Sequence, residues 1–402
     1  MKGFFDIKDV QSTSRPSGKV NSCASCGLYK HCKHPKMKAV GNFQKGILII
    51  GESPSEREDL TGKPFSDKLS NILKDQLTVL GIDLYEDCAS IYACRCFVKN
   101  WKGAESSHVD NCRRFVLKTI SELQPTLIIL LGDAAINSII SHRWKRNMGG
   151  VQKWRGWQIP DQDFKAWICP TFSLSFVEKS EKEVLTLFKA DLSNAIEYLG
   201  KALRKYKKPE IRYLESLTEL NSIKEGTSCA FDYETTGLKP HAKGHRIVCA
   251  SIAVSEDLVY TFEMPKSKVE RKPFIDFLAN PLIAKRAHNM KFEQAWSVIR
   301  LKQPVVNWEF DSMLAAHILD NRTGVTGLKF QTYVQFGIVD YDSEVAPYLH
   351  SGSKDGNALN NIVKGMEIMK KDILTYCAMD SIFEYRLSEL QIEIMNYDFL
   401  PF

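Results

Sequence analysis

Short apolar runs recur through the first half of the chain and alternate with stretches in which apolar positions have helical spacing. Two of these runs, residues 46–51 (GILIIG) and 126–132 (TLIILLG), are almost wholly aliphatic and end in glycine. Runs of this length and composition are typical of strands that are buried on both faces of a parallel sheet. Strands that alternate with helices predict a three-layer α/β domain with a largely parallel sheet.

In the second half, an apolar run leads directly into two carboxylates, Asp232 and Glu234, which are two residues apart. On a strand, the side chains at positions i and i+2 leave the same face. Two carboxylates this close repel each other, and ionising both is costly unless a cation lies between them. The pair therefore predicts a divalent-metal site, although a solvated strand face is the simpler interpretation of the pair taken alone.

Three further blocks follow downstream: residues 288–293 (HNMKFE), 310–314 (FDSML) and 376–380 (YCAMD). Tyr376 and Asp380 are four residues apart and share one face if their segment is helical. The order, spacing and residue types of all four blocks resemble the DEDD-type 3′→5′ exonuclease domain that proofreads for DNA polymerases of the bacterial polymerase I family. The resemblance covers about residues 210–395. It implies a ribonuclease H-like domain with a mixed sheet.

The exonuclease resemblance implies phosphodiester hydrolysis with two metal ions, Mg²⁺ or Mn²⁺, on single-stranded or frayed 3′ ends of DNA. The metal ligands that it implies are Asp232, Glu234, Glu293 and Asp380. Tyr376 would orient the attacking water. The residues that would contact the terminal nucleotide are Leu238, Asn289 and Phe292, and ordinary packing is the alternative role for these three.

Glu293 departs from the family pattern, which has Asp at this position. Glu is one methylene longer, and Mg²⁺ requires oxygen ligands in near-octahedral geometry. The longer side chain either misplaces the second metal ion or is accommodated by a small backbone shift, and we expect activity to be retained. Asp311 is an alternative carboxylate, although its block has a structural role in the family.

Near the beginning of the chain, Cys23 and Cys26 form a Cys-x-x-Cys pair, and residues 51–65 read GESPSEREDLTGKPF. This segment resembles the signature of the iron–sulfur uracil-DNA glycosylases of the fourth family, which read Gly-Glu-Ala-Pro-Gly, then Glu-Asp, then Gly-x-Pro-Phe. The resemblance covers about residues 20–200.

The glycosylase resemblance implies four cysteine ligands, because Cys112 matches the family's fourth cysteine and the family's spacing counted back from it reaches Cys96. The implied set is Cys23, Cys26, Cys96 and Cys112. Thiolates suit a 4Fe-4S cluster or, alternatively, tetrahedral Zn²⁺, and Cys32 or Cys94 is an alternative to one of the four. The remaining cysteines lie in apolar surroundings and are expected to be buried; they are Cys88, Cys169, Cys229, Cys249 and Cys377.

The catalytic part of the glycosylase resemblance is incomplete. Glu52 and Phe65 remain, but the family's uracil-reading Asn falls on Tyr92 and its late His falls on Ser173. A tyrosine in place of a small amide could also fill the pocket. Loss of the base reader and of the imidazole removes several kcal/mol of transition-state stabilisation. We therefore expect a vestigial pocket that keeps the fold and the cluster but has lost, or greatly reduced, uracil excision.

The length and charge of the chain suit two domains and a nucleic-acid partner. The chain has 402 residues with a net charge of +6, which permits DNA binding without requiring it. Basic clusters at residues 30–38, 143–155 and 201–208 fit a surface facing phosphates, and each alone also fits a solvated face. The expected organisation is a mobile arm (1–20), a glycosylase-like domain with the cysteine set (21–200), a linker (201–210) and the exonuclease domain (211–402).

The sequence contains no apolar run of eighteen residues and no signal-peptide pattern, so a cytoplasmic protein without a membrane partner is expected, in the host cytoplasm if a bacteriophage encodes it. A glycosylase-like domain followed by a proofreading exonuclease is the order at the front of some bacteriophage DNA-directed DNA polymerases. This chain ends at residue 402 without room for a polymerase domain.

We therefore expect a proofreading exonuclease of phage DNA replication, with the DNA polymerase as a separate subunit or missing downstream. Its N-terminal domain would bind DNA or the partner without catalysis. The alternatives are a non-catalytic polymerase accessory scaffold and an active uracil-DNA glycosylase.

Overall fold

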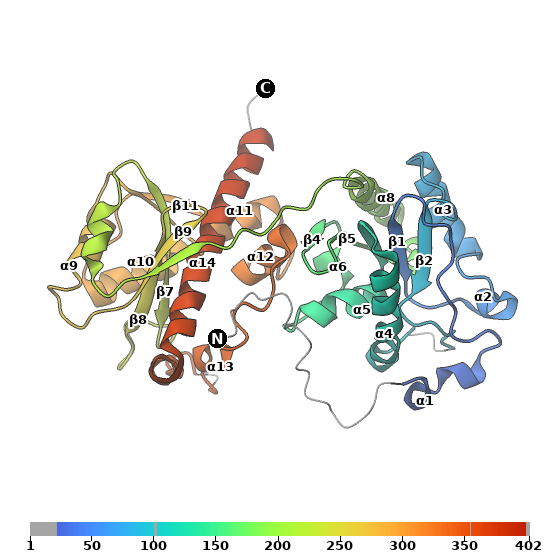
Figure 1. The fold of residues 1–402 in the computed structure, drawn as a ribbon, viewed down its shortest axis with the longest axis horizontal. Helices are drawn as coiled ribbons and strands as arrows, with labels where there is room; N and C mark the ends of the chain where they lie inside the picture. Colours follow the sequence, from blue (N-terminus) through green and yellow to red (C-terminus); the bar gives the residue numbers. More distant parts are fainter. Residues whose placement is uncertain (1–21, 100–102, 354, 399–402) are drawn as a thin grey trace. The chain divides into compact units, whose positions relative to one another are not determined.

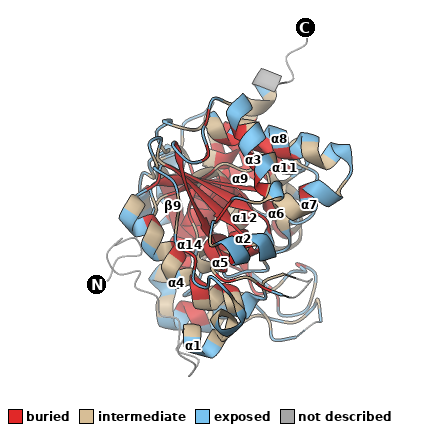
Figure 2. Ribbon diagram, turned by 90° about the vertical axis from the view of Figure 1, so that its right-hand side faces the viewer, coloured by how far each residue is buried: buried red, intermediate tan, exposed pale blue. Residues whose placement is uncertain are grey.

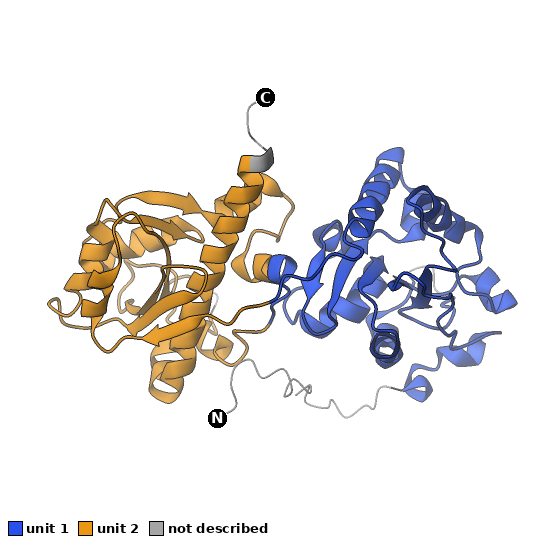
Figure 3. Cartoon of the chain, turned by 45° about the horizontal axis from the view of Figure 1, so that its top comes forward, with its two compact units in different colours: residues 1–205, 333–339 blue, residues 206–332, 340–402 orange. Residues whose placement is uncertain are grey.

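The computed structural model describes residues 22–99, 103–353 and 355–398. The chain divides into two compact units (Figure 3). Unit 1 comprises residues 1–205 and 333–339, and unit 2 comprises residues 206–332 and 340–402. The arm expected at residues 1–20 lies outside the described residues.

Unit 1 is built on a five-stranded sheet in the order β2-β1-β3-β5-β4 (Figure 1). Its strands are β1 (Ile47–Gly51), β2 (Cys88–Tyr92), β3 (Leu127–Leu131), β4 (Ile159–Asp161) and β5 (Ala166–Thr171). The pairs β1–β2, β1–β3 and β3–β5 are parallel, and β4 joins the edge antiparallel to β5. Every residue of these strands is buried, which is the pattern of a sheet covered on both faces. The predicted, largely parallel sheet is confirmed.

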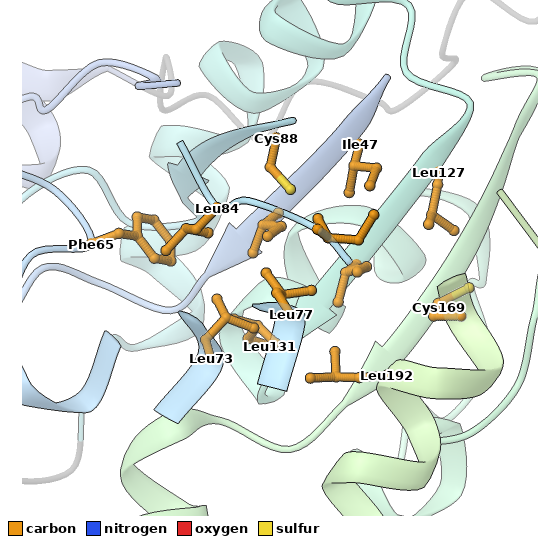
Figure 4. Close-up of a cluster of buried hydrophobic side chains, with 14 of the residues drawn as sticks. Ile47, Phe65, Leu73, Leu77, Leu84, Cys88, Leu127, Leu131, Cys169 and Leu192 are labelled. Carbon is orange, nitrogen blue, oxygen red and sulfur yellow. The ribbon is translucent and has the colours of Figure 1, made fainter. Parts of the chain in front are cut away.

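Helices cover both faces of this sheet. They are α1 (Cys23–Cys26), η1 (Leu28–His31), α2 (Glu56–Thr61), α3 (Lys68–Val79), α4 (Ser106–Leu123), α5 (Asp133–Arg143), α6 (Val151–Trp154), α7 (Leu174–Lys179) and α8 (Lys182–Ile196). Alternate residues of β1 and β3, such as Ile47 and Leu127, pack with Leu73 and Leu77 of α3 and with Leu192 of α8 (Figure 4). The helices α4 and α5 pack together, and α5 contacts β1 and β3, so the unit has the predicted three layers.

Unit 2 is built on a six-stranded sheet in the order β11-β10-β7-β8-β9-β6. Its strands are β6 (Glu210–Tyr213), β7 (Ser228–Thr235), β8 (Ile247–Ala253), β9 (Leu258–Glu263), β10 (Ala284–Ala287) and β11 (Trp308–Asp311). Strands β7, β8 and β9 form an antiparallel meander. On the other side of β7, strand β10 pairs in parallel with β7, and β11 pairs in parallel with β10. This mixed five-strand arrangement, with β6 added beside β9, confirms the ribonuclease H-like fold.

The helices of unit 2 divide between the two faces of its sheet. They are η2 (Leu217–Ser222), α9 (Lys272–Ala279), α10 (Met290–Trp296), η3 (Ser297–Leu301), α11 (Ser312–Leu319), α12 (Leu328–Phe336), α13 (Ala346–Leu349) and α14 (Ile362–Asp398). Helix α12 belongs to unit 2 only up to Thr332. Phe231 and Tyr233 of β7 pack in an aromatic core with Phe274 of α9 and Trp296 of α10. On the other face, Ala230 packs in a cluster with residues of α14. Figure 2 shows the buried residues gathered on the strands and on the inner sides of the helices.

Helix α14 is long but is interrupted at Met369, whose backbone (φ −139°, ψ 47°) is not helical. Beyond this break, small side chains bring the helix close to the sheet: Ser251 of β8 donates a hydrogen bond to the carbonyl of Cys377 and is 2.6 Å from the hydroxyl of Ser381. Within the described part of the chain, no helix combines the length and apolar character needed to span a membrane.

Candidate active site

Three carboxylates converge where β7 faces α14 in unit 2. Asp232 and Glu234 alternate with the core residues Phe231 and Tyr233, so the period of the strand turns both acids away from the aromatic core. Asp380 comes from α14, and one potential ligand oxygen of each acid lies within 4.8 Å of the others. The sequence prediction that Asp232 and Glu234 share a face agrees with this geometry.

The electrostatics of this acid group favour a bound cation. Burial raises the pKa of Asp232 well above its ordinary value, and the charge of Asp380 raises it further. Burial also raises the pKa of Glu234, followed by the charge of Asp232. A hard divalent cation with oxygen ligands would offset both costs, so these three residues fit a Mg²⁺ or Mn²⁺ ion.

Glu293 on α10 lies at the margin of the acid group. It is 2% exposed, and its Oε2 atom has no hydrogen-bond partner among the described residues. Burial raises its pKa, followed by the charge of Asp232. The structure therefore brings three of the four expected ligands together, while Glu293 is not among the acids whose ligand oxygens converge and keeps a buried oxygen unpaired by any residue that the structure describes.

Tyr376 lies one helical turn before Asp380 and is 7% exposed. Two residues that the sequence motifs did not single out complete this corner of the site. Lys329 of α12 forms an ion pair with Asp380, and the hydroxyl of Tyr341 donates to the same carboxylate oxygen at 2.7 Å. The ammonium of Lys329 lies 4.0 Å from the ring centroid of Tyr341 and 4.3 Å from that of Tyr376.

Asp311 has a structural role. One of its carboxylate oxygens accepts hydrogen bonds from the backbone N–H groups of Asn289, Met313 and Leu314, and the other accepts one from Met290. It thereby caps α11 and holds Asn289 in a left-handed conformation (φ 77°) at the beginning of α10. Asp311 is not among the three acids whose ligand oxygens converge, and both of its oxygens accept backbone hydrogen bonds.

Behind the acids lies a buried polar chain that sequence reasoning also missed. His288 Nδ1 is 2.8 Å from the hydroxyl of Ser312, which donates to Glu384 on α14, and Ser388 donates to the other oxygen of Glu384 at 2.8 Å. Burial raises the pKa of Glu384 to about 7 and lowers the pKa of His288 to about 4. Between these pH values both groups are neutral, so their 3.7 Å approach is not an ion pair.

The three residues expected to contact the terminal nucleotide differ in their exposure. Leu238 follows β7 and is 74% exposed, so its side chain is free to contact a ligand. Phe292 is partly buried against the aromatic core, with its ring centroid 5.9 Å from that of Trp296. Asn289 is held through its backbone by Asp311.

In unit 1, the residues of the glycosylase-like pocket form two separate pairs. The first is Phe65 with Tyr92, whose rings stack with their centroids 4.5 Å apart and their planes 6° apart. The hydroxyl of Tyr92 donates to Glu58 at 2.7 Å and accepts from the backbone N–H of Phe65 at 3.1 Å. One face of the Phe65 ring is therefore covered by a side chain of the same domain.

The second pair is Glu52 with Ser173, which together line an open hollow bounded by α5, α6 and α7. Glu52 accepts a hydrogen bond from the backbone N–H of Ala134, and burial raises its pKa. Gly132 lies between the pair: a Cβ atom there would be 2.6 Å from the carboxyl carbon of Glu52 and 2.6 Å from the Cβ of Ser173. Only glycine fits at this approach.

A separate hollow in unit 1 is lined by sulfur atoms. Its cysteines are Cys23, Cys26, Cys94, Cys96 and Cys112. Ser22 and Ser25 cap α1, which carries the first two cysteines, and Ser25 also donates to Asn111 beside Cys112 at 3.0 Å. Cys32 is not one of the lining residues but adjoins the hollow: its thiol donates to the carbonyls of Leu28, which lines the hollow, and Phe97, and it also interacts with Cys96.

The chemistry of this hollow fits a thiolate-bound metal centre. A hydrogen bond from Cys94 lowers the pKa of Cys112 to about 6, while burial raises the pKa of Cys96 to about 12. A soft metal centre is the partner that such a set of thiolates would bind. The other five cysteines are buried, as predicted.

Comparison with known proteins found similarity over part of the chain. Residues 39–200 match the uracil DNA glycosylase superfamily. The type-4 uracil-DNA glycosylase of Saccharolobus solfataricus is 28% identical over 158 residues, which are 38% of this chain and 71% of that protein. The corresponding enzyme of Thermotoga maritima is 26% identical over 186 residues, which are 46% of this chain and 93% of that protein.

One further curated protein and two solved structures are also similar to part of this chain. The DNA polymerase I of Chloroflexus aurantiacus is 27% identical over 188 residues, which are 44% of this chain and 18% of the polymerase. Among solved structures, Brucella melitensis NrnC is similar with a TM-score of 0.36 and 19% identity, over 47% of this chain and 83% of that chain. Escherichia coli RNase D is similar with a TM-score of 0.35 and 11% identity, over 48% of this chain and 46% of that chain.

Proposed function

We propose that this protein is a metal-dependent 3′→5′ exonuclease that hydrolyses DNA from single-stranded or frayed 3′ ends. The observation that carries the proposal is the convergence of Asp232, Glu234 and Asp380, with their oxygens within 4.8 Å of one another, on a ribonuclease H-like sheet. Divalent metal ions bound there would activate water and stabilise the leaving 3′ oxygen of a phosphodiester.

Each residue of the site has a proposed role in metal binding, water orientation or nucleotide contact. Asp232, Glu234 and Asp380 would hold one metal ion, while Glu293 and Asp232 would share a second. The hydroxyl of Tyr376 would orient the attacking water from its position one turn before Asp380. The exposed Leu238 would contact the terminal nucleotide next to the acids on β7.

Unit 1 is proposed to be a non-catalytic glycosylase-like domain that binds DNA or a protein partner. Tyr92 covers the stacking face of Phe65, and Ser173 stands where the family has a histidine. A 4Fe-4S cluster held by Cys23, Cys26, Cys96 and Cys112 would stabilise the domain. Because the order of the two domains resembles the front of certain phage replicative polymerases, the proposed partner is a DNA polymerase domain or subunit.

The proposal is tested by digestion of single-stranded DNA labelled at the 3′ or the 5′ end, with Mg²⁺ or Mn²⁺. We expect the wild type to release the 3′ label first and the Asp232→Ala variant to release none. Asp276→Ala is the matched control, because Asp276 is an exposed acid on α9 that pairs with Lys272. Absence of digestion by the wild type with both metals would overturn the exonuclease and favour the accessory scaffold.

A further inference from the structure

Lys329 brings a positive charge to the acid group from a different part of the chain. It lies on α12, fifty-one residues before Asp380, and its side chain is 17% exposed. The ammonium contacts Asp380, is 2.8 Å from the hydroxyl of Tyr341, and lies over the rings of Tyr341 and Tyr376. Aromatic faces attract cations, so these rings hold the ammonium in place while leaving its charge directed at the carboxylates.

The charge of Lys329 reaches the whole acid group. It opposes the rise in the pKa of Asp232 and also the rise in the pKa of Glu234. Without a metal ion, four carboxylates lie in this region, and the ammonium offsets part of their mutual repulsion. Lys329 therefore acts as a counter-cation on the same carboxylates that fit a divalent ion.

We propose that Lys329 is a built-in cation that competes with a divalent metal ion for the Asp232–Glu234–Asp380 group and thereby sets the metal affinity of the site. This inference rests on the proposed exonuclease function. A dication that approaches Asp380 meets an ammonium already bound to it, and the two positive charges repel each other in a mostly buried setting. The site would then fill only when the metal concentration is high enough to overcome this repulsion.

The competition between Lys329 and the metal ion is measured as metal affinity. Calorimetric titration of the full-length, metal-free protein with Mn²⁺ is the measurement, because Mn²⁺ prefers carboxylates to the thiolates of unit 1. We expect Lys329→Met to lower the dissociation constant for Mn²⁺ by about tenfold or more. Lys329→Arg keeps the charge and is expected to bind Mn²⁺ as the wild type does.

Control variants separate this inference from the proposed function. Lys272→Met removes an exposed lysine that pairs with Asp276 and is expected to leave Mn²⁺ binding unchanged. If Asp232→Ala binds Mn²⁺ as tightly as the wild type, the acid group is not the metal site and the proposed function fails. If Asp232→Ala loses binding but Lys329→Met binds Mn²⁺ with unchanged or lower affinity, the competition is wrong and Lys329 instead orients Asp380. Lys329→Gln, which keeps a donor for Tyr341, serves if Lys329→Met does not fold.

Discussion

The ring of Tyr92 lies nearly parallel to the ring of Phe65, with 4.5 Å between their centroids. Both residues are buried, at 6% and 1% exposure, so no space remains between them for a third ring. A glycosylase must stack a flipped base in a closely fitting pocket and read its edge by hydrogen bonds. In this domain Tyr92 stacks on Phe65 and its hydroxyl donates to Glu58, so the face of Phe65 turned towards Tyr92 is not open to a ligand.

Removal of the tyrosine should reopen the pocket. Tyr92→Asn restores the amide that the glycosylase family uses, and we expect it to bind free uracil detectably by NMR titration, which the wild type does not. The loss of a buried aromatic ring should cost about 3 kcal/mol of unfolding free energy, measured by chemical denaturation of unit 1. Tyr198→Asn, which removes a ring packed on Trp167, is the control. Uracil binding by the wild type at the same affinity would contradict the occupied pocket.

The buried carboxyl of Glu384 should make the stability of unit 2 depend on pH. Its pKa is raised from 4.5 to about 7, mainly by burial, so the folded state holds this proton more tightly than the unfolded state. The resulting stabilisation is complete below the ordinary pKa and is lost as the pH rises through about 7. The loss amounts to about 3 kcal/mol.

Glu384→Gln removes this titration while keeping a group that hydrogen bonds to Ser312 and Ser388. We expect the variant to match the wild type near pH 4 and to exceed its unfolding free energy near pH 8, in the presence of a chelator. Glu393→Gln, at an exposed position of the same helix, is the matched control. A constant difference between Glu384→Gln and the wild type at both pH values would show that Glu384 does not titrate in this range.

The cysteine hollow yields a spectroscopic prediction. Protein purified without oxygen should absorb at about 400 nm and contain iron and sulfide, as proteins with thiolate-bound iron–sulfur clusters do. Cys112→Ser is expected to lose the band, whereas Cys94→Ser should keep it, because Cys94 contributes a hydrogen bond to Cys112 in the proposed set. Cys169→Ser, buried in the core of the same unit, is the control. A colourless protein with one zinc per chain would replace the cluster by a zinc site.

The parts of the fold that depend on local periodicity could be predicted from the sequence. Buried aliphatic runs indicated β1 and β3, and the spacing of Asp232 and Glu234 on one strand placed both acids on one face. Tyr376 and Asp380 were expected to share one face if their segment was helical, and both lie on α14. In each case the period of side chains along a single strand or helix is enough to tell which residues share a face.

What could not be predicted depends on contacts between distant segments. Lys329 belongs to no recognised block, and only the packing of α12 brings it to Asp380. The hydrogen bonds from His288 through Ser312 to Glu384 likewise join segments that are far apart in the sequence. For Tyr92, the sequence showed only that a large side chain replaces a small amide. It did not show that the ring would stack on Phe65, since a sequence does not specify the angle between two rings.

Glu293 is the residue on which the chemistry of the acid group is most open to experiment. Its Oε2 atom is buried without a partner among the described residues, so the side chain has an unused ligand atom. If Glu293 holds a second metal ion, Glu293→Gln should reduce exonuclease turnover by about a hundredfold, because the neutral amide is a weak ligand. Binding of the first Mn²⁺ ion should be retained, since its three ligands are unchanged.

Glu293→Asp is the companion variant, because it keeps the charge and shortens the side chain by one methylene to the length that the family uses. We expect it to retain at least about a tenth of the wild-type turnover, measured by release of the 3′ label at saturating Mn²⁺. The expected turnover is therefore highest for the wild type or Glu293→Asp and lowest for Glu293→Gln. Equal turnover for the wild type and Glu293→Gln would show that Glu293 is not a ligand, and the three-acid group would then work without a fourth carboxylate.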